Sequence, residues 1–217
     1  MVVEEKLTET PRGGRGFLGF PVNTDLDSLD AHIAVLGVPY GLPYTPDDLS
    51  NDQSRAPDLL REKAQDAGWS EPRTITHFDW DLGGPILDNR DVRVVDCGNV
   101  TADFQNPREH YRRAEAAAKK IFQSGAVLIS IGGDHGIPIP IMRALPADEP
   151  VTLIQIDAHM DWRDNVNGEK DGYSSPIRRA SELPFVKDIF QIGLRGVGSG
   201  REEEREAALN YGAHLIS

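Results

Sequence analysis

Short apolar runs rich in β-branched residues alternate with stretches of helical periodicity along the chain. Runs typical of buried strands lie at residues 32–38, 92–96, 126–131, 151–156, 188–193 and 214–217. Apolar positions at helical spacing predict a helix over residues 107–123, and shorter helices are expected after Ser54, at 137–145 and at 202–209. This order predicts an α/β fold built on a doubly wound, mostly parallel sheet with right-handed crossovers.

The chain divides into a lead-in and one domain. Residues 1–30 are rich in Pro, Gly, Thr and charge, so they are expected to form an N-terminal arm without core elements. Residues 31–217 are of single-domain length and are expected to form one α/β domain. Residues 40–53 and 74–90 lack periodicity and predict loops, the first at the active-site edge. His110, at the start of the long helix, is expected to be solvated.

The composition narrows the possible partners. A net charge of −12 argues against nucleic acid or an anionic membrane, because both bind clusters of Lys and Arg. It would attract a cationic substrate, although solubility alone is a sufficient reason for the charge. No apolar run approaches the ~20 residues that cross a bilayer, and the N-terminus lacks the pattern of a secretory signal. The single cysteine, Cys97, excludes an internal disulfide, so a cytoplasmic protein is expected.

Two of the predicted strands end in carboxylate and imidazole groups. Gly132-Gly133-Asp134-His135 follows one, and Asp157-Ala158-His159-Met160-Asp161 follows the next. Parallel strands deliver such side chains to the same edge of a sheet. If extended geometry persists past Ile156, then Asp157, His159 and Asp161 share one face, and His135 joins them from a neighbouring strand.

These four side chains are the candidate metal ligands. Carboxylate oxygens and imidazole nitrogens without a thiolate favour manganese or another first-row divalent ion over a structural zinc, and the region has room for two cations ~3.5–4 Å apart. A single Asp or His at a strand end is more often a helix cap or a hydrogen-bonded polar residue. Two such clusters in succession favour the metal interpretation.

These residues resemble the first two signatures of the arginase/agmatinase ureohydrolase family, with the agmatinase branch the closer match. Weaker matches fall in the same order along the chain, at residues 36–40, 54–57, 96–99 and 191–196. The resemblance implies a three-layer α-β-α fold and a binuclear Mn²⁺ centre that hydrolyses a small cationic guanidino substrate, agmatine or a related alkylguanidine, to urea and an amine. It also implies a homo-oligomer, a trimer or a hexamer.

The resemblance assigns each ligand a role. Asp157 would be the catalytic carboxylate that bridges the metals, His135 and Asp161 would complete the first site, and His159 would bind the second. The family's third motif, Ser-x-Asp-x-Asp-x-x-Asp-Pro, is absent, so the last strands of the domain are expected to be missing and the second site keeps only Asp157 and His159. The alternative is a truncated, catalytically impaired ureohydrolase with a structural or subunit-pairing role.

A second departure concerns the active-site loop. The family commonly places a proton-shuttling His there, whereas this chain has no His between His159 and His214. Tyr173 occupies the corresponding stretch and is a candidate hydrogen-bond donor, although loop packing explains it equally well. A pKa of about 10 makes a tyrosine a poor shuttle.

Two rival enzyme classes remain for comparison. In binuclear metallophosphoesterases, Asp-x-His precedes Gly-Asp, which is the reverse of the order here. A zinc deacetylase of related architecture would hold one metal instead of two, so metal stoichiometry separates it from a ureohydrolase.

Overall fold

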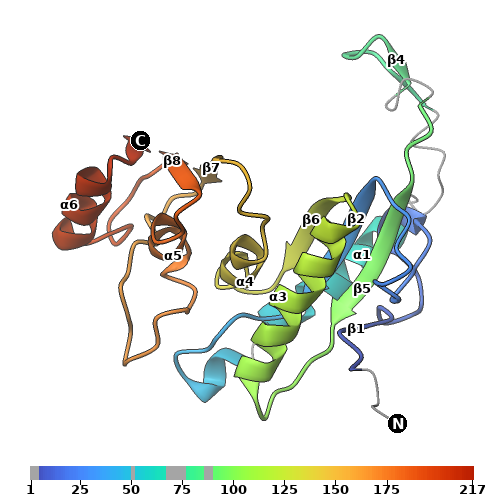
Figure 1. The fold of residues 1–217 in the computed structure, drawn as a ribbon, viewed down its shortest axis with the longest axis horizontal. Helices are drawn as coiled ribbons and strands as arrows, with labels where there is room; N and C mark the ends of the chain where they lie inside the picture. Colours follow the sequence, from blue (N-terminus) through green and yellow to red (C-terminus); the bar gives the residue numbers. More distant parts are fainter. Residues whose placement is uncertain (1–4, 50–51, 67–76, 86–89) are drawn as a thin grey trace.

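The computed structural model describes residues 5–49, 52–66, 77–85 and 90–217 (Figure 1). One sheet has four strands in the order β1-β5-β2-β6, and another has three in the order β7-β8-β9. All neighbouring strands in these two sheets run parallel except β1 and β5. The strands are β1 Thr8–Glu9, β2 Ile33–Val38, β5 Val94–Val100, β6 Val127–Gly132, β7 Val151–Ile156, β8 Val186–Ile192 and β9 His214–Ile216.

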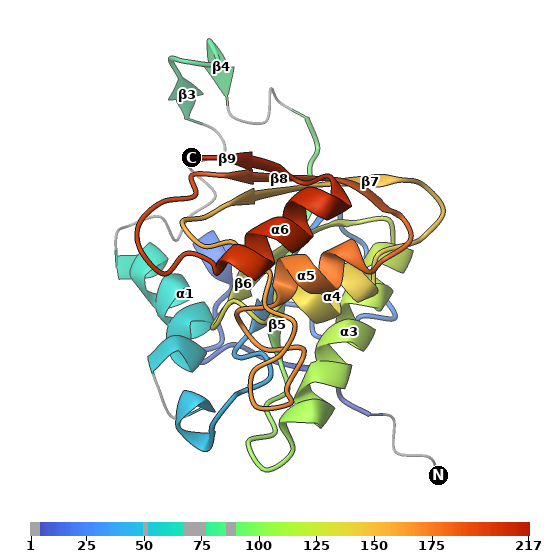
Figure 2. The ribbon, with the colours of Figure 1, turned by 90° about the vertical axis from the view of Figure 1, so that its left-hand side faces the viewer.

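Helices line both sheets. The α-helices are α1 Ala56–Asp66, α3 Pro107–Gln123, α4 Pro138–Arg143, α5 Pro176–Ser181 and α6 Glu202–Tyr211. Short 3₁₀ helices are η1 Phe17–Gly19, η2 Pro46–Leu49 and η3 Asp52–Arg55. α1 and α3 lie on opposite sides of the four-stranded sheet (Figures 1 and 2). Within the described ranges, none of these helices is both long and apolar enough to span a membrane.

The predicted α/β architecture is confirmed, and α3 has the predicted bounds. Asn106 caps α3 by accepting the Glu109 N–H, and Pro107 fills the first helical position, where its missing N–H costs nothing. Of the predicted stripe, Ala114 and Ile121 are buried in the core of the four-stranded sheet, and Ala118 is buried as well. α5 was not predicted, because its six residues are too short to show a helical period.

The parallel strands divide between two sheets, which the sequence pattern did not indicate. Among the described strands, β6 pairs only with β2 and β7 pairs only with β8. α5 and α6 cover one face of the three-stranded sheet (Figure 2), where Ile177, Ile189 and Ala208 are buried together. On its other face Ile154 is 61% exposed and Ile156 is 83% exposed. This face is an apolar surface without a covering layer in the described part of the chain.

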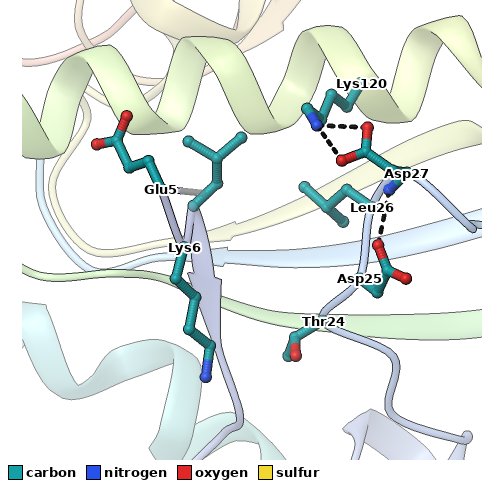
Figure 3. Close-up of a pocket in the computed structure, with 8 residues that line it drawn as sticks. Glu5, Lys6, Thr24, Asp25, Leu26, Asp27 and Lys120 are labelled. Atoms are coloured by element: carbon teal, nitrogen blue, oxygen red, sulfur yellow. Dashed lines mark hydrogen bonds and ion pairs between the residues drawn. The ribbon is translucent and has the colours of Figure 1, made fainter. Parts of the chain in front are cut away.

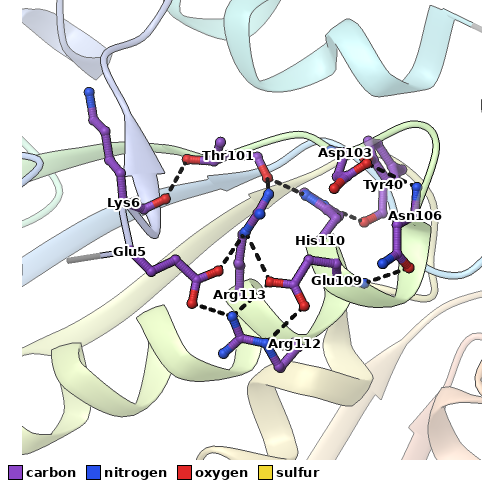
Figure 4. A network of polar contacts seen from close by, with 10 residues as sticks. All are labelled: Glu5, Lys6, Tyr40, Thr101, Asp103, Asn106, Glu109, His110, Arg112 and Arg113. Atoms are coloured by element: carbon purple, nitrogen blue, oxygen red, sulfur yellow. Dashed lines mark hydrogen bonds and ion pairs between the residues drawn. The ribbon is translucent and has the colours of Figure 1, made fainter. Parts of the chain in front are cut away.

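The described part of the lead-in, residues 5–30, packs on the domain. The prediction that residues 1–30 lack core elements is wrong, because β1 extends the four-stranded sheet and Leu26 is buried in the core beneath α3. Glu5 forms ion pairs with Arg112 and Arg113 of α3 (Figure 4). Farther along this helix, Lys120 pairs with both carboxylate oxygens of Asp27 at the rim of a cavity of about 200 Å³ (Figure 3). These contacts fasten the lead-in to its own chain.

His110 is buried, so the prediction that it is solvated is wrong. Its Nδ1 lies 3.2 Å from the Thr101 carbonyl oxygen and its Nε2 lies 3.0 Å from the Tyr40 carbonyl oxygen (Figure 4). The imidazole also stacks on the Tyr40 ring, with 3.9 Å between ring centroids. Burial lowers its pKa, and the two carbonyl oxygens oppose that shift in part.

Asp96 and Asn99, part of a sequence match in β5, bind Arg61 of α1. The Arg61 guanidinium donates to both carboxylate oxygens of Asp96 at 2.8 Å and to Asn99 Oδ1 at 2.6 Å. Asp96 also accepts the Phe17 N–H of the lead-in at 2.6 Å. This stretch therefore joins α1, β5 and the lead-in. Cys97 is buried beside it, as expected for a small residue of a strand.

The predicted loop at residues 74–90 lies partly outside the described residues. Its described portion contains a small hairpin of β3 Phe78–Asp79 and β4 Gly84–Pro85, which projects from the body in Figure 1. Gly83 takes a φ of +68°, which a residue with a side chain adopts at a cost.

Candidate metal centre

A tight turn after β6 presents His135. A Cβ atom on Gly133 would lie 1.8 Å from the Pro39 carbonyl oxygen, so only glycine fits there. The Asp134 carboxylate accepts the N–H groups of Gly41 and Gly136, each at 2.7 Å. Burial raises the pKa of Asp134. Asp134 thus connects the turn to the loop after β2, while His135 stays a candidate ligand.

The segment after β7 does not continue as a strand. Extended geometry ends at Ile156, and the His159 N–H donates to Asp157 Oδ1 at 2.9 Å in a bend. Asp161 has a φ of +48°, and its carbonyl oxygen accepts the N–H groups of Ile177 and Arg178 at the start of α5. The shared face expected from strand alternation is therefore replaced by a compact turn.

Three of the four predicted ligands come together. His135, Asp157 and Asp161 offer one ligand atom each within 4.8 Å of one another. His135 Nδ1 lies 2.8 Å from Asp161 Oδ2 and 3.5 Å from Asp157 Oδ2. The hydrogen bond to Asp161 raises the pKa of His135, against the opposing effect of burial.

His159 lies outside this group of three. Its side chain is 64% exposed, and its Nδ1 is 3.4 Å from Asp157 Oδ1. The two oxygens of Asp157 therefore face different imidazoles, with Oδ2 toward His135 and Oδ1 toward His159. A carboxylate in this position has the geometry to contact two cations.

The donor set fits a first-row divalent cation. Two carboxylates and one imidazole, with no thiolate, suit manganese and related ions, which take mixed oxygen and nitrogen ligands. Three protein ligands leave coordination positions open, as a catalytic metal requires. Asp161 is only 9% exposed, whereas His135 and Asp157 are reached from solvent.

Two cavities open onto the centre. All four predicted ligands line a cavity of about 290 Å³. A second cavity, of about 410 Å³, is bordered by Asp48, Gln53, Asp134 and His135. Tyr173 lines both. Its ring packs against Tyr44 with 4.5 Å between centroids, and partial burial raises its pKa. Its role as a hydrogen-bond donor stays a prediction.

Sequence reasoning missed the residues that support the centre. Tyr44 accepts the Ser174 N–H at 3.0 Å and so holds the loop that carries Tyr173. Gln155 and Gln191 lie behind Asp161 in β7 and β8. The available signal was a polar residue at a buried position of each apolar strand, since an unpaired amide is costly there.

Known proteins match this chain over most of its length. The model of the Arginase family matches residues 31–217. The chain is 32% identical over 192 residues to the mitochondrial guanidino acid hydrolase of Homo sapiens, which is 86% of this chain and 49% of that protein. It is also 32% identical over 189 residues to the mitochondrial agmatinase of Gallus gallus, at 86% and 51% coverage. The chain thus spans about half the length of these curated relatives.

Solved structures share the fold. Proclavaminate amidino hydrolase from Streptomyces clavuligerus superposes with a TM-score of 0.73 at 20% identity, over 99% of this chain and 65% of that one. Arginase from Medicago truncatula gives a TM-score of 0.63 at 22% identity, over 87% and 57%. A formiminoglutamase of Trypanosoma cruzi, solved with Mn²⁺, gives 0.64 at 20% identity, over 88% and 63%.

Proposed function

Since the chain belongs to the arginase family, we propose that its site takes part in the manganese-dependent hydrolysis of a guanidino compound to urea and an amine. The substrate would be agmatine or a related alkylguanidine. The observation that carries this proposal is the group of His135, Asp157 and Asp161, which gathers two carboxylates and an imidazole in the wall of one cavity, with His135 also bordering a second.

The chemistry requires an activated water. A guanidinium carbon is a weak electrophile, and two bound divalent cations lower the pKa of a water that they share toward neutrality. His135, Asp157, Asp161 and His159 would hold the cations, because Asp157 lies between the His135 and His159 imidazoles. Tyr173, with its raised pKa, stays protonated at neutral pH and can donate a hydrogen bond to the substrate but cannot accept a proton.

The larger cavity favours a cation. Asp48 and Asp134 supply carboxylates to its wall, and no Lys or Arg is among its lining residues in the described part of the chain. A guanidinium or ammonium group would be attracted there, in agreement with the net charge of −12. We extend the proposal to a cytoplasmic homo-oligomer in which this cavity receives the substrate.

A second candidate is an impaired ureohydrolase that binds one cation and makes no urea. Two observations favour it. The second cation would have only Asp157 and His159 among the described residues, which is a small ligand set for a divalent ion. The open face at Ile154 and Ile156 also leaves the three-stranded sheet without a second covering layer. In this candidate the chain contributes half of a centre and pairs with other polypeptide.

One experiment separates the two candidates. Mn²⁺ is titrated into the metal-free chain and free Mn²⁺ is followed by electron paramagnetic resonance, while urea release from agmatine and other guanidino compounds is assayed in the same samples. Two bound ions with urea support the hydrolase, and one ion without urea supports the half-centre. Absence of binding contradicts both. Asp157→Asn is expected to abolish binding, and Asp188→Asn, an exposed carboxylate of β8, serves as the matched control.

A further inference from the structure

Two buried glutamine side chains form a chain directly behind Asp161. Gln155 in β7 and Gln191 in β8 are Cα partners across this parallel pair, and both side chains are buried. Gln155 Nε2 donates to Asp161 Oδ2 at 2.9 Å, and the same oxygen lies 2.8 Å from His135 Nδ1. Gln191 Nε2 donates to Gln155 Oε1 and to the Met160 carbonyl oxygen.

This chain has a defined direction. Gln191 Nε2 lies 2.6 Å from the backbone carbonyl oxygen of Met160, which can only accept a hydrogen bond, so that atom must be the nitrogen of its amide. Gln155 must then turn its oxygen toward Gln191 and its NH₂ group toward Asp161. The Met160 carbonyl group therefore sets the orientation of the Gln191 amide, and the Gln191 amide sets that of Gln155, whose NH₂ group donates to the Asp161 carboxylate.

The Asp161 side chain depends on this hydrogen bond for its orientation. Its φ of +48° lies in the left-handed region, which non-glycine residues rarely adopt, and the residue lies between β7 and α5, outside both elements. The first turn of α5 binds only its backbone carbonyl oxygen. Within the described residues, Gln155 supplies the side-chain contact that directs the carboxylate toward His135.

Packing alone does not account for the two amides. The neighbouring positions on the covered face of these strands, Leu153 and Ile189, are apolar. Gln191 Oε1 is buried without a hydrogen-bond partner in the described part of the structure, which is unfavourable for folding. An apolar side chain at position 191 would remove this atom but would also leave the Met160 carbonyl oxygen and Gln155 Oε1 without their donor, so the amides serve the polar contacts around Asp161.

We propose that Gln155 positions Asp161 for metal binding and that Gln191 in turn positions Gln155. This inference rests on the metal centre of the proposed function. Residues that orient ligands from behind typically change metal affinity by about 10- to 100-fold when they are replaced. Neither glutamine is expected to touch the cation or the substrate.

The test compares Mn²⁺ affinities of the full chain by electron paramagnetic resonance. Gln155→Met keeps the length of the side chain and removes the donor, so its Mn²⁺ affinity is expected to fall about tenfold or more. Gln191→Met should weaken binding too, yet add little when combined with Gln155→Met, because both act through the same contact. Gln123→Met, at the exposed end of α3, is the matched control and should bind as the parent does. Unchanged affinity in Gln155→Met overturns the proposal.

A metal-free readout separates this inference from the proposed function. Hydrogen exchange of the Gln155 side-chain NH₂ group, followed by NMR, should be slow in the parent chain and fast in Asp161→Ala. If the parent chain binds no Mn²⁺, the proposed centre fails, and slow exchange that depends on Asp161 still supports the positioning contact. If the exchange rate of the Gln155 NH₂ group is the same in the parent and in Asp161→Ala, the positioning contact is contradicted, whether or not the chain binds Mn²⁺.

Discussion

His110 joins two loops through one buried ring. It contacts the carbonyl oxygen of Tyr40, at the entrance to the loop that borders the larger cavity, and that of Thr101 after β5. Arg113 opposes protonation of the imidazole and Asp103 favours it, while burial dominates and lowers the pKa. The neutral ring is therefore the form that the fold prefers.

This preference predicts a loss of stability in acid. Below the ordinary His pKa of 6.5 the unfolded chain takes up a proton that the folded chain does not. The free energy of unfolding therefore decreases as the pH is lowered, until the pH reaches the lowered pKa of His110 in the folded chain. The slope from this one group is at most ~1.4 kcal/mol per pH unit. His110→Gln should be less stable than the parent at neutral pH, and the difference should narrow in acid.

Urea denaturation of the parent and of His110→Gln at about pH 7.5 and about pH 5.5 measures this change. His77→Gln, an exposed histidine of the described hairpin segment, is the control and should follow the parent at both values. A difference between parent and His110→Gln that stays constant with pH would contradict the assignment.

At the scale of elements, α1 is fastened to the four-stranded sheet by one buried cation. Arg61 and Asp96 are almost completely buried, and the guanidinium also reaches Asn99. Removing the arginine leaves the Asp96 carboxylate in the interior without its partner, which typically costs ~3–5 kcal/mol. The α1–β5 contact therefore depends on charge pairing as much as on apolar packing.

Arg61→Leu is expected to lower the free energy of unfolding by ~3–5 kcal/mol, measured by urea denaturation. Arg61→Lys should recover only part of this lost free energy of unfolding, because an ammonium group cannot donate to Asp96 and Asn99 in the fork geometry of arginine. Arg55→Leu breaks the exposed contact with Asp52 and should cost less than ~1 kcal/mol. An Arg61→Leu chain as stable as Arg55→Leu would refute this account.

The elements that the sequence predicted are those with a complete local signal. α3 has an N-cap, an N1 proline, an apolar stripe and a glycine after its end, and β7 is a mostly apolar run rich in β-branched residues, so their bounds agree with the prediction. β1 and α5 are too short to show a period. The ligand types could be predicted because strands end abruptly in Asp and His, whereas the left-handed turn at Asp161 depends on α5 and could not.

At the scale of the whole molecule, an apolar face remains open. Ile154 and Ile156 project from β7 on the side that α5 and α6 do not cover, and Ile192 and Ile216 are also exposed in β8 and β9. Contiguous apolar surface of this kind promotes association between chains. The division into two sheets also arises at this scale, because strand pairing is a long-range property that single apolar runs do not encode.

The double substitution Ile154→Lys/Ile156→Lys is expected to reduce self-association in sedimentation velocity. Because both side chains are exposed, the free energy of unfolding should change by less than ~1 kcal/mol. The control is Leu153→Lys, on the covered face of the same strand, which should destabilise the chain. Self-association that persists in the double variant would show that this face is not its cause.

The convergence of two separate sheets on one group of ligands has a consequence for unfolding. His135 belongs to the end of β6 and Asp161 to the segment after β7, so a cation held by both would act as a removable cross-link between the two sheets. In calorimetry the metal-free chain should melt in two steps, and saturating Mn²⁺ should merge them into one at higher temperature. The ion would then govern the cooperativity of the molecule as well as its chemistry.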